Sequence, residues 1–106
     1  MADMSNVLEV DLLNSTLNGA AFTPVDNPYV LLWTSDPTDA ETGTEVSGGS
    51  YARVASSFPT ATTNTVATDA DVTFAEATST WGTVGWIGLH SASTGTGNMI
   101  YHTALD

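Results

Sequence analysis

Cysteine is absent from this 106-residue chain, and basic residues are almost absent. Without cysteine the protein can form neither disulfides nor thiolate metal sites. The only lysine or arginine is Arg53, set against twelve carboxylates, and the formal net charge is −11. Because phosphate backbones and anionic membranes are bound through Lys and Arg, this charge argues against both as partners. The complementary partner would be a basic protein surface.

Long apolar runs are missing too. No segment approaches the ~20 apolar residues that a membrane-spanning helix needs. The first five residues, Met1–Ser5, lack the basic region and apolar core of a signal peptide. These absences predict synthesis and residence in a cytosol.

Hydroxyl-bearing and hydrophobic residues fill the space that charged residues leave. Charged residues make up 12% of the chain, about half the usual share, while hydrophobic residues make up 42%. Threonine is abundant, and its branched Cβ suits a pleated, half-buried surface. Length and composition predict one mainly β domain over residues 1–106.

The N-terminal segment predicts a helix over residues 5–17. Ser5 is a suitable N-cap and Asn18-Gly19 a suitable stop. The apolar positions at helical spacing are Leu8, Leu12, Leu13 and Leu17. The stretch Leu8–Leu12 also alternates as a strand would, but the Leu12-Leu13 doublet and the stop signal favour the helix.

Strands are predicted between residues 29 and 105. Tyr29–Trp33 is a continuous apolar run, and Thr38–Ser50 reads as a long loop. Further strand candidates are Tyr51–Ala55, Asp71–Ala75, Trp86–His90 and Met99–Ala104. Alternation turns Val72 and Phe74 inward, and in the last strand it opposes Ile100, His102 and Ala104 to their neighbours. Short strands at regular spacing predict an antiparallel β-sandwich, or a jelly-roll-like fold, with one N-terminal helix.

Oxygen and imidazole ligands gather in two places without forming a metal-site pattern. The acidic loop holds Asp36, Asp39, Glu41 and Glu45. Calcium binds such clusters, but the EF-hand order is missing, and Asp36 before Pro37 is better explained as a turn former. His90 and His102 lie on the two strands of the predicted final hairpin, with no third ligand at a suitable spacing. We predict no metal site.

Arg53 is expected to pair with a carboxylate, because its planar fork suits bidentate contact. Asp36, Glu45 or an acid of another subunit could serve. A ligand clamp is the alternative, and we favour a structural anchor.

No catalytic or cofactor motif is present. The Gly-x-Ser-x-Gly elbow is missing, and Gly82, Gly85 and Gly88 do not match a dinucleotide fingerprint. We predict no enzymatic activity and no cofactor.

The three tryptophans offer one alternative function. Trp33 and Trp86 lie in strand candidates and are expected in the core or a subunit interface. Trp81, between Thr80 and Gly82, is the one suspected of exposure. An exposed indole face would suit a sugar-binding site.

Nearly the whole chain resembles a family of small virion structural proteins of tailed bacteriophages, often labelled tail-fibre proteins. The resemblance rests on the stretches Leu32–Asp39, Gly43–Arg53, Val72–Thr78, Trp81–Val84 and Gly97–Leu105. The related chains tend to carry lysine or arginine in the first helix, whereas this helix has none.

The resemblance implies a virion component assembled in the host cytoplasm. One implied role is a capsid decoration (cement) protein, a homotrimer bound to the major capsid protein. The other is a tail-fibre or baseplate component with receptor or glycan binding, in contact with a tail protein. Because the chain reads as one complete domain, we favour the cement role. We expect Trp- and Leu-lined faces to form subunit contacts, and the helix or the Thr38–Ser50 loop to touch the shell.

Overall fold

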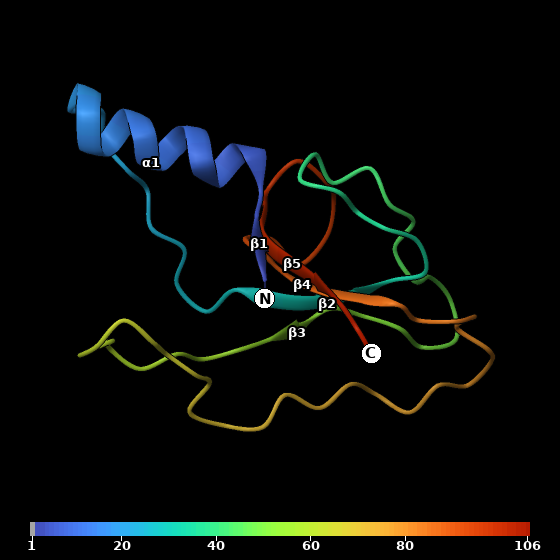
Figure 1. Cartoon of the computed structure of the whole chain (residues 1–106). Helices are drawn as coiled ribbons and strands as arrows, with labels where there is room; N and C mark the ends of the chain where they lie inside the picture. The colour runs from blue at the N-terminus through green and yellow to red at the C-terminus, as the bar shows by residue number, and fades with distance from the viewer. Residues whose placement is uncertain (1) are drawn as a thin grey trace.

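The computed structural model describes residues 2–106, which form a five-stranded antiparallel sheet, one helix and long coil segments (Figure 1). In chain order the elements are β1 (Asp3–Met4), α1 (Asn6–Asn18), β2 (Tyr29–Trp33), β3 (Val54–Ala55), β4 (Trp86–His90) and β5 (Met99–Ala104). The strand order across the sheet is β1-β5-β4-β2-β3. The predicted antiparallel β fold with one N-terminal helix is confirmed. The sandwich or jelly-roll arrangement, which needs a second sheet, stays a prediction.

The core lies on one face of the three long strands. Leu31, Trp33 and Met99 are buried together, and Trp86 packs against them. Trp33 and Trp86 are direct cross-strand partners, as are Leu31 and Gly88, and such partners share a face. The ring of Trp33 lies over Gly88, where an added Cβ would stand 2.5 Å from the ring. Gly88 therefore makes room for the largest core side chain.

A β-bulge at Ile100 places Met99 on the same face of β5 as His102. Leu89 pairs with Tyr101, but His90 pairs with Met99, so Ile100 is the extra residue. Met99 and His102 are consequently both buried on the core face. The strict alternation predicted for this strand is wrong at its first residues.

The strand predicted over Tyr51–Ala55 is shorter than expected. Only Val54 and Ala55 pair, with Val30 and Tyr29. Farther along β2 the edge is already occupied, because the Leu32 N–H donates to the Tyr51 hydroxyl and the Leu32 carbonyl accepts from the Val46 N–H. Both backbone groups of Leu32 are therefore already hydrogen-bonded, and residues 51–53 cannot pair with β2 there.

The strand predicted over Asp71–Ala75 does not form. Val72 and Phe74 are half-buried and their neighbours exposed, as the alternation predicted, but the backbone runs as coil. The nearby edge strand β3 is only two residues long and cannot support a longer partner. In Figure 1 this coil lies on one side of the sheet and the loop of residues 34–50 on the other.

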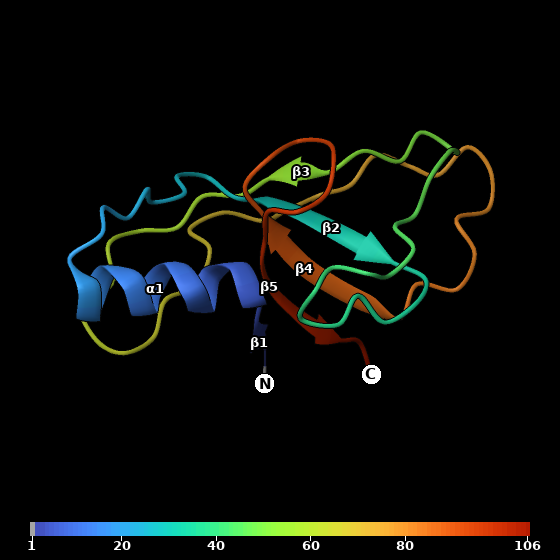
Figure 2. The same ribbon diagram turned by 90° about the horizontal axis from the view of Figure 1, so that it is seen from above.

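Helix α1 projects from the end of the sheet (Figure 2). The molecule is accordingly elongated, with extents of 47 × 29 × 24 Å. Within residues 2–106, no helix combines the length and apolar character that crossing a membrane requires.

Candidate interaction surface

Arg53 joins three segments of the chain. Its Nε and Nη2 donate to the two carboxylate oxygens of Glu45 at 2.8 and 2.7 Å. Its Nη1 and Nη2 also donate to the carbonyls of Ala92 and Gly95, in the turn between β4 and β5, at 3.0 and 2.6 Å. Only 3% of the Arg53 side chain is exposed. The single strong cation of the chain is thus used inside the fold.

Glu45 is held ionised by these contacts. Burial opposes its charge, but hydrogen bonds from Arg53 and Tyr51 and the Arg53 charge outweigh burial and lower the pKa of Glu45. Burial, together with the bond to Glu45, raises the pKa of Tyr51. Of the two partners expected within the chain, Glu45 is the one in contact. Asp36 instead accepts from the Thr38 N–H at 2.9 Å, as a turn former does.

The two histidines bind the acidic loop to the sheet. His102 Nε2 lies 2.8 Å from Asp39 Oδ1, and His90 Nε2 lies 3.0 Å from Glu41 Oε1. His90 is fully buried, and its Nδ1 accepts from the Ala92 N–H at 3.0 Å. Burial, reinforced by the Arg53 charge, lowers the pKa of His90. Because Nδ1 accepts the hydrogen bond from Ala92, the neutral form of the ring carries its proton on Nε2, the atom beside Glu41.

The carboxylates of the acidic loop attach the loop to the sheet and are not arranged around a common ligand. Glu41 also accepts from the backbone N–H groups of Gly97 and Met99. Among residues 2–106, no three His, Asp or Glu side chains come together as metal ligands would. Sequence reasoning missed the histidine–carboxylate pairs. The sequence did contain a signal for these pairs. Two acids two residues apart, Asp39 and Glu41, are equal in number to the two histidines on neighbouring strands.

Trp81 is half-buried, so the expectation of an exposed indole is wrong. Its ring packs edge-on against Tyr51 and Phe74, with centroids 5.5 and 6.3 Å away. Its Nε1 donates to the Gly49 carbonyl at 2.9 Å. A Cβ on Gly49 would stand 2.9 Å from the Trp81 ring, so this glycine permits the close approach. A sugar-binding face on Trp81 has no support in this geometry.

Exposed apolar side chains concentrate around α1. Eight large hydrophobic residues are exposed within residues 2–106: Val7, Val10, Leu13, Leu17, Phe22, Val25, Val66 and Leu105. The first four lie on α1, and Phe22 and Val25 lie on the segment that follows it. Val66 lines the same groove as Leu8 and Leu12 of the helix. Seven of the eight therefore border one element.

The sequence of α1 explains its shape but not its exposure. Ser5 caps the first turn by accepting from the Leu8 N–H at 3.2 Å, and its own hydroxyl donates to the Met99 carbonyl. Gly19 ends the helix with a φ of 66°. None of the helical residues is buried. The helix is therefore anchored at its first turn and lies open beyond it.

The predicted leucine stripe is divided between two sides of α1. Leu8 and Leu12 are half-buried and face the body of the protein. Leu13 and Leu17 are 57% and 80% exposed, and Val7 and Val10 are 46% and 55% exposed. At about 100° per residue, Leu12 and Leu13 lie on different sides of a helix. We call Val7, Val10, Leu13 and Leu17 the outer stripe.

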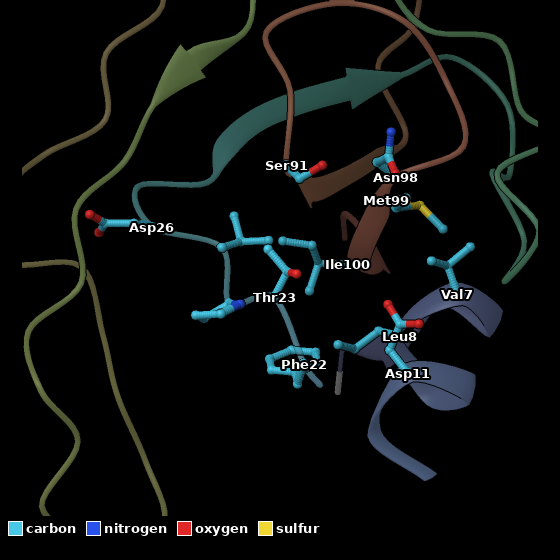
Figure 3. A pocket seen from close by; sticks show the side chains of 12 residues that line it. Val7, Leu8, Asp11, Phe22, Thr23, Asp26, Ser91, Asn98, Met99 and Ile100 are labelled. Carbon is cyan, nitrogen blue, oxygen red and sulfur yellow. The ribbon is translucent and has the colours of Figure 1, made fainter. Parts of the chain in front are cut away.

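A groove of about 370 Å³ separates α1 from the body of the protein. Figure 3 shows Leu8 of the helix, Phe22 of the next segment and Ile100 of β5 converging on it. A neighbouring hollow of about 430 Å³ shares Leu8 and Phe22 and continues to Phe58, Val66 and Tyr101. The carboxylates of Asp11 and Asp26 line the first groove. The surface around α1 is thus apolar in the middle and acidic around it.

The model of the family described as podophage GP4 fiber I protein gp80 matches residues 3–106. The search of curated proteins and the search of solved structures each found no significant match.

Proposed function

Since the chain belongs to the podophage GP4 fiber I protein gp80 family and is therefore a bacteriophage virion structural protein, we propose that it is a non-enzymatic subunit of a virion fibre. The observation that carries this proposal is the extent of the family match, which covers residues 3–106 and so includes the helix, the sheet and every contact described above. The description of the matched family names a fibre protein, which favours the fibre role over the cement role.

The internal use of Arg53 supports a passive structural role. The guanidinium joins Glu45 to the β4–β5 turn, and the two histidines hold the acidic loop. The most prominent polar side chains are thus occupied in holding the fold. The surface left for partners is the apolar and acidic region around α1.

Capsid decoration is the second candidate. The net charge of −11 supports it, because a strongly acidic chain suits a basic shell surface. Self-association as a homotrimer, contact with the major capsid protein or a tail protein, and assembly in the host cytoplasm stay predictions.

Copy number per particle tests the proposal. Purified virions of the encoding phage would be analysed by quantitative mass spectrometry, with an isotopically labelled recombinant chain as standard. A fibre subunit is expected in a few to a few tens of copies, and antibody labelling should then place it on the tail or another discrete fibre site. A copy number close to that of the major capsid protein would favour decoration. Absence from the particle would refute both roles.

A further inference from the structure

Helix α1 has apolar side chains on two opposite sides. Leu8 and Leu12 face the body of the protein. The outer stripe of Val7, Val10, Leu13 and Leu17 is exposed on the other side, and Val7 at its edge also lines the groove. Exposed apolar side chains that lie together on one side of an element mark a contact surface for another molecule. Because no helical residue is buried in the described structure, the outer stripe is accessible to another molecule.

The charges along the edges of the outer stripe identify the partner. At about 100° per residue the stripe covers roughly 120° of the helix surface, from Leu13 to Val7, and this arc also holds Asn6 and Asn14. By the same spacing Glu9 lies about 40° beyond Leu13, and Asp11 lies about 40° beyond Val7, toward the groove that it also lines. Each edge of the stripe thus carries a carboxylate, and no basic side chain occurs anywhere on the helix.

A second copy of this chain fits these edges poorly. Every copy would bring the same acidic edges, and its only arginine is committed to Glu45 with 3% of the side chain exposed. Two copies meeting along α1 would therefore place carboxylates against carboxylates, which is unfavourable. A groove rimmed by Lys or Arg would pair with both edges.

We infer that α1 inserts its outer stripe into an apolar groove of a different virion protein, and that Lys or Arg side chains on the rim of that groove meet Glu9 and Asp11. This inference rests on the proposed function, since the partner is another component of the same particle. It deepens that function by naming the attachment element and the chemistry of its receptor. The anchored first turn of α1, held by Ser5, fixes how the stripe is presented.

The test compares two leucine variants in particles assembled by complementation. Leu13→Ser lies in the stripe, whereas Leu105→Ser changes the one large hydrophobic residue among residues 2–106 that is exposed away from α1. Because both side chains are exposed in the free protein, both variants should keep the wild-type circular dichroism and melting curve. We expect Leu13→Ser to lower the copies per particle at least tenfold, and Leu105→Ser to stay within twofold of wild type.

A charge variant separates the acidic edges from the apolar stripe. Glu9→Gln combined with Asp11→Asn should lower incorporation and make the chain dissociate from purified particles at lower NaCl concentration, because opposite charges at the contact are screened by salt. Photo-crosslinking from position 13 should reach a polypeptide of another sequence, at a site rich in Lys or Arg.

Each other outcome overturns the inference in a distinct way. Wild-type incorporation of Leu13→Ser, or unchanged salt release of the charge variant, would refute the docking helix while leaving the fibre role intact. Crosslinks that join only copies of this chain, with a wild-type oligomer that Leu13→Ser dissociates in sedimentation, would make a second copy the occupant. Absence of the wild-type chain from particles would overturn the proposed function and this inference together.

Discussion

Replacing Arg53 with methionine should destabilise the protein by about 3 kcal/mol, at the lower end of the ~3–5 kcal/mol typical for breaking a buried ion pair. The substitution keeps an apolar stem of similar length but removes both bonds to Glu45 and both bonds to the turn carbonyls of Ala92 and Gly95. Charge-assisted hydrogen bonds contribute about 1.5–3 kcal/mol each. The Glu45 side chain is 27% exposed, so water compensates part of the loss.

Urea unfolding followed by tryptophan fluorescence measures this loss. In a domain of this size about 3 kcal/mol corresponds to a fall in Tm of roughly 12–24 °C. Arg53→Lys is the matched control, since it keeps the charge but loses the planar fork, and about half of the loss is expected. Combined with Glu45→Gln in a double-mutant cycle, Arg53→Met should give a coupling energy of at least ~1.5 kcal/mol. A change below about 1 kcal/mol for Arg53→Met would refute the anchoring role.

Three further predictions follow from the core and its edges. Because the folded pKa of His90 lies below its ordinary 6.5, the unfolded chain binds the proton first, so wild-type stability should fall as the pH drops below about 6.5. His90→Gln, compared with wild type by urea unfolding from pH 8 to 5, should not show this fall in stability. Parallel stability curves for the two proteins would contradict the prediction. Gly88→Ala should lower the free energy of unfolding by ~1–3 kcal/mol through the clash with Trp33. Gly85→Ala, with nothing within 4 Å of the added Cβ, should leave the free energy of unfolding nearly unchanged. Equal Tm values for the two variants would refute the packing argument. Trp33→Ala should cost about 3–5 kcal/mol and half-buried Trp81→Ala clearly less, so the reverse order in thermal melts would relocate the core.

Local signals in the sequence predicted much of the fold. Ser5 and Gly19 delimit α1 because capping chemistry acts within one turn. Tyr29–Trp33 became β2 at the predicted bounds, since a continuous apolar run of strand length has few other stable environments.

Long-range competition decided the elements that sequence reasoning missed. Tyr51 was expected in a strand, but its hydroxyl takes the Leu32 N–H across 19 residues, and no periodicity encodes such a contact. Ile100 forms a bulge that depends on the register of β4 against β5. Alternation in one strand cannot predict a shift in its partner.

The candidate site was partly predictable for the same reason. A single arginine among twelve carboxylates had to pair, but Glu45 rather than Asp36 follows from the bridge that sets Glu45 beside Trp33. The outer stripe was missed because the four leucines were treated as one face. The angular separation of Leu12 and Leu13 could have revealed the second side.

The position of Arg53 also determines how the folded protein meets proteases. Trypsin cleaves after lysine and arginine, so the whole chain offers it a single bond, Arg53–Val54. That bond enters β3, and its arginine is enclosed by Glu45 and the β4–β5 turn. Cleavage therefore requires the contacts of Arg53 with Glu45 and the β4–β5 turn to open. The rate of trypsin digestion thus reports how often the fold opens at this one place. A virion component built this way resists a common digestive enzyme for as long as it stays folded.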